Sequence, residues 1–393
     1  MNTKLVIFGI TGDLSRRKLL PVLDDMAKRG SLSDVEVVGI SRRQVDASEL
    51  LMSSVGDDTL MSRVSILTMD LADSKNYKKL KDHLDLGGTT QILIYLAVPP
   101  GASAQIADLL GENGLNTANV RLLFEKPFGF DLESAKEFIS RTGRYFNEQQ
   151  IYRIDHYAVK DIAAALLDFK TEDDNLNQWS NKSVKSITIE ATESIDIEDR
   201  AAFYEQTGAL RDVLQGHLMQ LLALVLMDTA DDFKAENLPK YRLKALDTVS
   251  PANPKLATRG QYEGYDNDVS NPGSLVETFA SVELQSADPR WDGVQIRLVT
   301  GKAMDKKCTR ITVEYKDGRT DVFEEGGVLG ANYPAAYEHV LLEAIKGDEY
   351  IFTTSDEIIR SWEILAPVQK AWSDSGTQPM VYPRGSSIND ITV

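Results

Sequence analysis

One short segment, residues 151–160 (IYRIDHYAVK), concentrates side chains that can bind an anion. His156, Tyr157 and Lys160 place three hydrogen-bond donors within five residues. A phosphate monoester needs several convergent donors, because its desolvation is costly. The spacing therefore indicates a phosphate site, although a solvated helix start with incidental polar residues would look the same.

A second polar cluster lies between residues 193 and 220. Its only histidine, His217, stands just before an apolar stretch at 218–227 (LMQLLALVLM). An imidazole is suited to general-base catalysis near neutral pH, but a lone histidine beside a leucine-rich face is more often a core residue. The other members of the cluster are Glu193, Arg200, Gly208, Arg211, Asp212, Gln215 and Gln220.

Glycines mark the end of the first apolar run. The segment GITGDL at residues 9–14 is a shortened relative of the GxGxxG turn. Such a turn lets backbone amides approach a pyrophosphate, and the helix that follows supplies partial positive charge. A tight turn alone would also need glycine. We predict a dinucleotide site that includes Gly9, Thr11, Gly12, Asp13 and Leu14.

The end of the second apolar run bears on the choice of dinucleotide. Enzymes that use NAD commonly have an acidic residue there, which accepts hydrogen bonds from the ribose hydroxyls. This chain has Ser41, Arg42 and Arg43 instead. Arg42 is well placed to meet a 2′-phosphate, which favours NADP over NAD.

Hydrophobic patterning indicates which elements position these residues. The run KLVIFG at 4–9 is continuously apolar, as expected of a strand buried on both faces of a parallel sheet. We predict further strands at 35–40, 64–69, 91–98 and 120–125, and helices at 16–30, after Gly101 and at 131–141. This alternation predicts an α/β Rossmann-like domain over residues 1–154.

The second part of the chain has a different pattern. A long apolar helix is predicted at 209–228, and strands are predicted at 185–194, 274–284, 291–301 and 310–318. These elements indicate an α+β domain with a large, mainly antiparallel sheet over residues 155–393. The chain shows no internal repeat.

Eight segments resemble the glucose-6-phosphate dehydrogenase family and occur in the same order as in that family. The most specific are RIDHY at 153–157 and GALRDVLQGH at 208–217. The eight segments are GITGDLSRRKLLPVL, YLAVPP, FEKPFGFDL, YRIDHYAVK, FYEQTGALRDVLQGHLMQLLAL, RWDGVQIRLVTGKAM, AYEHVLLEAIKGDEYIF and SDEIIRSWEIL.

The resemblance implies a reaction and a catalytic pair. β-D-Glucose 6-phosphate would be oxidised to 6-phosphoglucono-1,5-lactone, with hydride transfer to NADP, or less effectively to NAD, and without a metal. His217 would remove the C1 hydroxyl proton, and Asp155 would orient the imidazole.

The resemblance also implies which residues bind the ligands. His156, Tyr157, Lys160, Lys302 and Lys307 resemble the residues that contact the sugar phosphate, and Glu193 and Asp212 resemble acceptors for its hydroxyls. Lys126 looks like a residue that touches both substrate and cofactor, and Pro127 is expected to follow a cis peptide bond. Pro99, in YLAVPP, resembles a cofactor contact.

This chain is shorter than typical family members, which have nearly 500 residues. The shortening falls near 316–333, where a longer strand-bearing stretch and a substrate-site glutamine are expected. Residues of a second, structural NADP site also belong to that stretch, so we expect this site to be lacking.

Composition narrows the choice of partners. The net charge of -17 argues against nucleic acid and anionic lipid, and the apolar stretch at 218–227 is too short to span a bilayer. The single cysteine, Cys308, fits a reducing cytoplasm.

We expect a cytoplasmic homodimer or higher homo-oligomer. The alternatives are a dehydrogenase of another 6-phosphosugar and, less favoured, a catalytically silent binding or assembly protein on the same fold.

Overall fold

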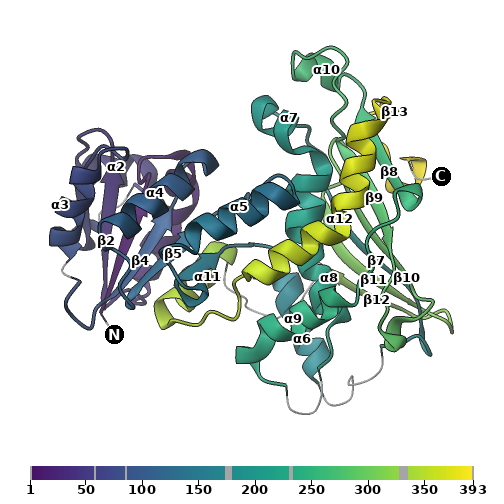
Figure 1. Ribbon diagram of the computed structural model, residues 1–393, viewed down its shortest axis with the longest axis horizontal. Helices are drawn as coiled ribbons and strands as arrows, with labels where there is room; N and C mark the ends of the chain where they lie inside the picture. Colours follow the sequence, from purple (N-terminus) through teal and green to yellow (C-terminus); the bar gives the residue numbers. More distant parts are fainter. Residues whose placement is uncertain are drawn as a thin grey trace. The chain divides into compact units, whose positions relative to one another are not determined.

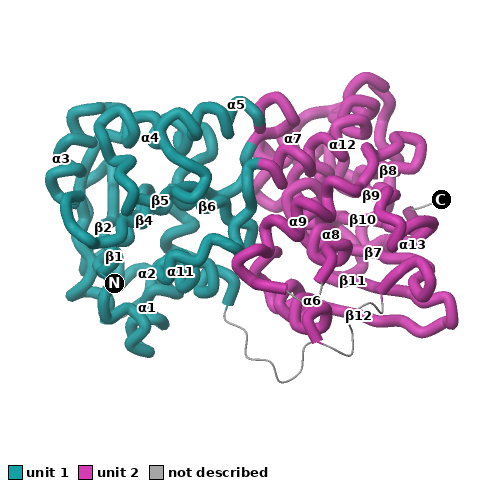
Figure 2. The backbone as a smooth tube through the Cα atoms, turned by 60° about the horizontal axis from the view of Figure 1, so that its bottom comes forward, with its two compact units in different colours: residues 1–128, 136–156, 334–355 teal, residues 129–135, 157–333, 356–393 magenta. Residues whose placement is uncertain are grey.

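The computed structural model describes residues 2–56, 59–84, 86–172, 179–229, 233–326 and 335–391. The chain forms two compact units, coloured separately in Figure 2. Unit 1 comprises Met1–Phe128, Lys136–His156 and Pro334–Ser355, and unit 2 comprises Gly129–Ala135, Tyr157–Tyr333 and Asp356–Val393. The limits 1–154 and 155–393 stay a prediction.

Unit 1 contains a parallel six-stranded sheet in the order β3-β2-β1-β4-β5-β6. Every pair of neighbouring strands is parallel, so the predicted Rossmann-like fold is confirmed. The strands are β1 (Thr3–Phe8), β2 (Val35–Ser41), β3 (Val64–Thr68), β4 (Gln91–Leu96), β5 (Val120–Phe124) and β6 (Ile151–Arg153).

The central strands are apolar because helices cover both faces of such a sheet. All six residues of β4 are buried, and the polar one, Gln91, donates from Nε2 to the Ala344 carbonyl oxygen at 2.9 Å. The helices assigned to this unit are η1 (Ser15–Leu19), α1 (Leu20–Lys28), α2 (Ala47–Ser54), η2 (Met61–Arg63), α3 (Ser74–Leu84), α4 (Pro100–Glu112), η3 (Glu148–Gln150) and α11 (Ala336–Lys346). Helix α5 (Leu132–Thr142) begins in unit 2 and continues in unit 1.

Unit 2 contains a seven-stranded sheet in the order β12-β11-β7-β10-β9-β8-β13 (Figure 1). Four of its pairings are antiparallel, whereas β10 pairs with β7, and β13 with β8, in parallel. The sheet is therefore mixed and mainly antiparallel, as predicted. The strands are β7 (Val184–Thr192), β8 (Ala257–Tyr262), β9 (Phe279–Leu284), β10 (Gln295–Gly301), β11 (Cys308–Tyr315), β12 (Thr320–Glu324) and β13 (Met380–Tyr382).

Helices of unit 2 pack beside this sheet. The principal ones are α6 (Asp161–Thr171), α7 (Ala201–Ala209), η5 (Leu210–Leu218), α8 (Met219–Leu226), α9 (Leu238–Asp247) and α12 (Ser355–Ser375). α12 is joined to α9 by a fully buried ion pair between Glu357 and Arg242, with Oε1 2.6 Å from Nε. This pair satisfies two charges that would be costly to bury alone.

The helical stretch Ala201–Leu226 is long and apolar enough to cross a membrane. Of its most apolar window, 78% is buried inside the described structure. Gly208 interrupts the stretch near the end of α7 with a φ of 61°. We call residues 210–226, formed by η5 and α8, the His217 helix.

Candidate functional site

Unit 1 has a pocket of about 490 Å³ at the carboxyl ends of its strands. It lies beside β1 and β4, where the strand order reverses, which is the usual place for a nucleotide in a doubly wound sheet. Of the predicted cofactor contacts, five line this pocket: Gly9, Thr11, Gly12, Arg42 and Pro99.

The backbone at Gly9 explains why glycine is required in the turn. Its φ is 81°, and a Cβ atom there would collide with the Ala97 carbonyl oxygen. The Gly9 carbonyl oxygen also accepts from the Gly12 amide at 2.8 Å and from Ser15 Oγ at 2.9 Å. The turn thus combines a left-handed conformation with a close approach of two backbones, as a phosphate-binding turn does.

The other predicted cofactor residues do not line this pocket. Asp13 and Leu14 follow the turn directly, and Lys126 lies after β5. The sequence analysis missed Asp70 and Gln105, which do line it. Asp70 comes directly after a predicted strand, and that position was the available signal.

A buried hydrogen bond supports the segment that contains Lys126. The hydroxyl of Tyr95, which is fully buried on β4, donates to Glu125 Oε1 at 2.5 Å. Burial raises the pKa of the Glu125 carboxyl to about 7, although the Tyr95 hydroxyl and the Lys126 ammonium group lower it. The Lys126–Pro127 peptide is cis, as expected.

Strand register in unit 2 brings two predicted substrate residues together. β7 and β10 are parallel with Thr192 opposite Gly301, so the next residues, Glu193 and Lys302, emerge at the same end of the sheet. The Lys302 ammonium group forms an ion pair with a Glu193 carboxylate oxygen. The Lys302 side chain is 7% exposed and that of Glu193 is 41% exposed, so the lysine is shielded from solvent while its partner is not.

Tyr204 was not singled out from the sequence, yet it lies beside this ion pair. Lys302 Nζ is 5.4 Å from the centroid of the Tyr204 ring. Burial raises the pKa of the Tyr204 hydroxyl, and the charges of Asp212 and Glu193 raise it further. Glu193 and Asp212, which are predicted to accept hydrogen bonds from the sugar hydroxyls, are therefore both close enough to Tyr204 to raise the pKa of its hydroxyl.

Besides Lys302, the lysines predicted to contact the sugar phosphate are Lys160 and Lys307. Lys160 is the N-cap of α6, and its Nζ lies 3.6 Å from the centroid of the Tyr157 ring. Lys307 is exposed just before β11, at the end of the sheet where Glu193 lies. Lys160 Nζ also pairs with Glu325 Oε2 at 3.0 Å.

His217 lies against Tyr157. The two rings are stacked, with centroids 4.1 Å apart and planes inclined by 21°, and His217 is 5% exposed. The structure therefore brings together, within unit 2, the last residue of RIDHY and the last residue of GALRDVLQGH. The imidazole is therefore buried and adjacent to Tyr157, one of the predicted phosphate contacts.

The His217 helix is held at both ends by charged side chains. At its start, Glu277 Oε1 accepts from the Leu210 amide at 2.9 Å. At its end, Lys170 Nζ donates to the carbonyl oxygens of Leu224, Val225 and Met227 at 3.1, 2.6 and 2.6 Å. A carboxylate at the N-terminus and a cation at the C-terminus both complement the helix dipole.

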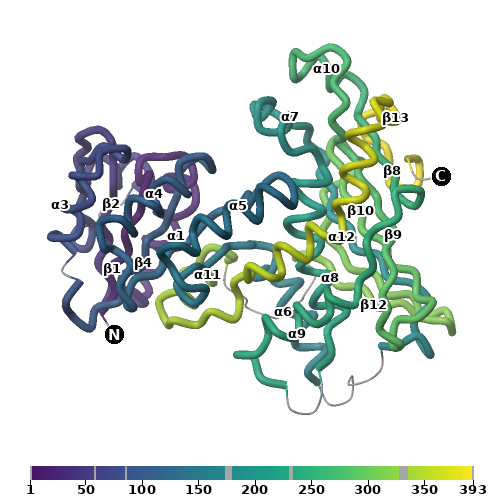
Figure 3. The backbone as a smooth tube through the Cα atoms, in the orientation of Figure 1, coloured from purple at the N-terminus to yellow at the C-terminus, as the bar shows by residue number. Residues whose placement is uncertain are grey.

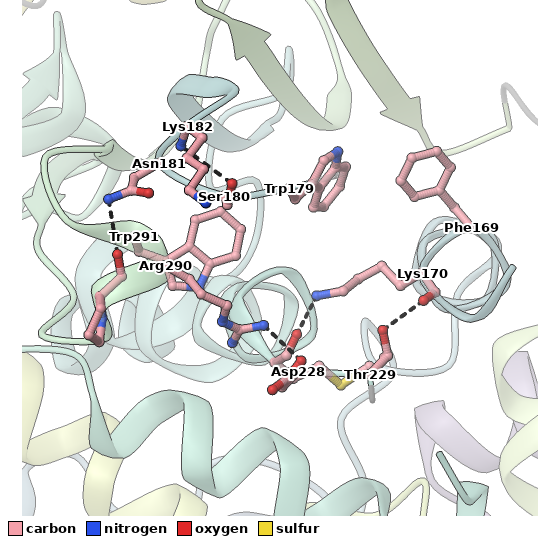
Figure 4. Close-up of a pocket in the computed structure, with 12 residues that line it drawn as sticks. Phe169, Lys170, Trp179, Ser180, Asn181, Lys182, Asp228, Thr229, Arg290 and Trp291 are labelled. Atoms are coloured by element: carbon pink, nitrogen blue, oxygen red, sulfur yellow. Dashed lines mark hydrogen bonds and ion pairs between the residues drawn. The ribbon is translucent and has the colours of Figure 1, made fainter. Parts of the chain in front are cut away.

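Lys170 lies in the last turn of α6 and therefore ties α6 to the end of α8. The two helices are labelled close together in Figure 3. Its side chain lines a cavity of about 360 Å³, shown in Figure 4. In the same cavity, Trp291 Nε1 and Arg290 Nη2 both donate to the Leu226 carbonyl oxygen at 3.2 Å. Donors from this cavity thus satisfy the carbonyl groups at the end of the helix.

Asp155 and His156 belong to unit 1, so the proposed pairing of Asp155 with His217 stays a prediction. Asp155 is 3% exposed, and His156 is partly buried. Tyr157, the first residue of unit 2, follows them directly in the chain.

These features define the class of the protein. A doubly wound sheet with a glycine-lined pocket at its switch point, followed by an α+β unit that gathers acidic, basic and imidazole groups, defines a nicotinamide-dependent dehydrogenase. The family model "Glucose-6-phosphate dehydrogenase, NAD binding domain" matches residues 6–164. The model "Glucose-6-phosphate dehydrogenase, C-terminal domain" matches residues 175–333 and 327–390. The chain belongs to the glucose-6-phosphate dehydrogenase family.

Individual relatives agree over nearly the whole chain. A glucose-6-phosphate 1-dehydrogenase of Chlamydia muridarum is 30% identical, with 94% of this chain and 90% of the relative covered. The crystal structure of glucose-6-phosphate 1-dehydrogenase from Mycobacterium avium is 28% identical with a TM-score of 0.85, covering 98% of this chain and 94% of that one. A glucose-6-phosphate dehydrogenase in complex with its substrate glucose-6-phosphate is 26% identical, with a TM-score of 0.88 and coverages of 98% and 95%.

The comparisons also bear on chain length. The alignment with the Chlamydia muridarum relative extends over 456 positions, more than the 393 residues of this chain. That relative therefore has stretches that this chain lacks. The predicted shortening near 316–333 reaches residues 327–333, which lie outside the described residues.

Proposed function

We propose that this chain oxidises β-D-glucose 6-phosphate at C1, producing 6-phosphoglucono-1,5-lactone and NADPH. The observation that carries the proposal is the convergence of His217, Tyr157 and Lys160 in unit 2, which combines a buried imidazole with donors for a phosphate group. Membership of the family supports the choice of reaction.

His217 is the general base in this proposal. Its imidazole takes the proton of the C1 hydroxyl as the C1–H bond breaks, and the C1–O bond becomes a carbonyl. Asp155, which precedes Tyr157 by two residues, orients the imidazole and stabilises its protonated form. NADP, when bound, supplies the acceptor for the hydride.

The sugar phosphate is bound by groups of both signs. His156, Tyr157, Lys160 and Lys307 bind the phosphate, and Lys126 contacts both substrate and cofactor. Lys302, held by Glu193, adds a shielded cation, and Glu193 and Asp212 accept hydrogen bonds from the sugar hydroxyls. Charge-assisted hydrogen bonds of this kind offset the desolvation of a phosphate dianion.

The position of Arg42 supports NADP as the preferred cofactor. Arg42 lines the pocket of unit 1 with an exposed side chain, where a 2′-phosphate would need a cation. Gly9, Thr11, Gly12 and Pro99 surround the same space, with Asp13 and Leu14 next in the chain. We propose that NAD is used less effectively and that no metal takes part, since proton removal and hydride transfer need none.

The remaining proposals concern assembly and location. We propose a cytoplasmic homodimer or higher homo-oligomer that binds neither nucleic acid nor membranes. The excess of acidic residues, 60 against 43 basic ones, supports the absence of polyanionic partners.

Initial rates of NADPH formation test this function. Glucose 6-phosphate, other 6-phosphosugars including an amino sugar phosphate, and unphosphorylated glucose should be compared by kcat/KM. Glucose 6-phosphate is expected to give the highest value, with unphosphorylated glucose at least about 100-fold lower because the phosphate contacts are lost. A higher kcat/KM for a different sugar phosphate would identify that compound as the substrate in place of glucose 6-phosphate. No turnover with any of these sugars would overturn the proposal that the chain is an enzyme.

A further inference from the structure

Glu325 places a carboxylate on one of the predicted phosphate-binding lysines. It follows β12 directly, and its Oε2 atom lies 3.0 Å from Lys160 Nζ. The side chains are 32% and 16% exposed, respectively, so the pair is more shielded than an ordinary surface ion pair. Both residues belong to unit 2.

Backbone contacts hold this carboxylate in place. The Glu325 amide donates to the Thr309 carbonyl oxygen at 2.9 Å, which continues the pairing of β12 with β11. The next amide, that of Gly326, donates to Asp161 Oδ2 at 2.7 Å, at the first turn of α6. The segment is therefore fixed on both sides of the Glu325 side chain.

The second predicted phosphate-binding lysine also acts on Glu325. Burial would raise the pKa of its carboxyl, but the charges of Lys160 and Lys307 and hydrogen bonds from Lys160 and Thr309 lower it overall. The carboxylate is thus an anion that is paired with Lys160 and is also stabilised by the charge of Lys307, and both of these cations are assigned to the phosphate.

We propose that Glu325 occupies part of the phosphate position in the ligand-free protein and competes with the sugar phosphate for Lys160. This inference rests on the proposed function, because that function assigns Lys160 to the phosphate. Binding of a dianion requires the carboxylate to leave Lys160 or to remain as a like charge beside the phosphate. Either way Glu325 weakens substrate binding and raises KM for the sugar phosphate.

The chain contains a matched control one residue away. Glu324 has the same charge, but its Oε2 atom pairs with Arg310 Nη2 at 2.9 Å. Glu324→Gln and Glu325→Gln therefore make the same change in net charge and in side-chain chemistry. Only the second removes the anion from Lys160.

Calorimetric titration with inorganic phosphate and with glucose 6-phosphate tests the proposal. Glu325→Gln is expected to lower both dissociation constants by about 5- to 20-fold, because a competing charge-assisted pair is removed, while Glu324→Gln changes them by less than about twofold. The affinity for NADP should be the same in all three proteins. A dissociation constant that is unchanged or higher in Glu325→Gln overturns the proposal, as does an equal decrease in Glu324→Gln.

A double-variant comparison shows whether Glu325 acts through Lys160. In a Lys160→Met background, Glu325→Gln should tighten phosphate binding by clearly less than it does in the wild-type background, and an effect of full size there would contradict the proposal. Measuring the turnover of 6-phosphosugars by the wild-type protein distinguishes a failure of this proposal from a failure of the proposed function. If phosphate binding tightens as expected but no 6-phosphosugar is oxidised, the competition stands and the proposed function fails.

Discussion

The imidazole ring of His217 is stacked on the phenol ring of Tyr157, with their centroids 4.1 Å apart. This contact joins the His217 helix to the segment that starts α6. Lys160 lies over the same Tyr157 ring, so one aromatic side chain separates the proposed base from a proposed phosphate ligand. We therefore propose two separable roles for Tyr157, in which its ring positions the imidazole and its hydroxyl binds the phosphate.

Two substitutions distinguish these roles. Tyr157→Phe keeps the ring and is expected to raise KM for glucose 6-phosphate by about 10-fold, the value of a hydrogen bond to a charged group, with kcat within about threefold of wild type. Tyr157→Ala also removes the stacking surface and should lower kcat by at least about 10-fold. Steady-state kinetics measure both, and equal kinetic constants for the two variants would contradict the role of the ring.

Arg42 is expected to select NADP. Arg42→Ala should raise KM for NADP by about 10- to 100-fold, the value of a charge-assisted contact, and leave KM for NAD within about twofold. Arg43→Ala is the control, since Arg43 is exposed next to Arg42 but does not line the pocket. Equal changes for NADP and NAD would remove this role from Arg42.

The raised pKa of Glu125 predicts that the stability of the folded protein depends on pH. Its folded-state pKa, about 7, lies above its ordinary value of 4.5, so between these pH values the unfolded chain has lost the proton that the folded protein keeps. Stability due to this group therefore falls as pH rises from 4.5 to 7, by at most about 3 kcal/mol.

Glu125→Gln keeps an acceptor for the Tyr95 hydroxyl and removes the titration. Relative to wild type, its free energy of unfolding should increase steadily from pH 4.5 to pH 7.5, as measured by urea denaturation. Glu49→Gln, which changes an exposed carboxyl, should show no such trend. A constant difference between Glu125→Gln and wild type across this range would contradict the raised pKa.

Lys170 is expected to stabilise the end of the His217 helix. Lys170→Met leaves three carbonyl groups without their donor and should destabilise the protein by about 2–4 kcal/mol. Lys182→Met removes an exposed lysine of the same cavity and should change stability by less than about 0.5 kcal/mol. Equal unfolding free energies for the two variants would show that the carbonyl contacts contribute little.

Local patterns predicted much of unit 1, because the strands of a parallel sheet are continuously apolar. The predicted strands at 4–9, 35–40 and 120–125 correspond closely to β1, β2 and β5. β6 was not predicted, since three residues are too few to show a periodicity. Its polar residue, Arg153, is buried and bridges to Thr353, a pairing distant in sequence.

Unit 2 was harder to predict, because its site depends on the order of the strands. The pairing of Glu193 with Lys302 follows from β7 and β10 being parallel neighbours, although about a hundred residues separate them. Nothing local in either strand indicates this pairing. Similarly, the sequence did not single out Tyr204, because the charges that act on it come from other elements of unit 2. It did not single out Glu325, because its ion pair with Lys160 joins residues far apart in the chain.

The most direct test of the account is kcat for glucose 6-phosphate oxidation by His217→Asn, with NADP saturating. The amide matches the size of the imidazole but cannot accept the C1 hydroxyl proton, so kcat should fall by about 10²- to 10⁴-fold while KM for glucose 6-phosphate stays within about threefold. A kcat within about tenfold of wild type would contradict the assignment of His217 as the base.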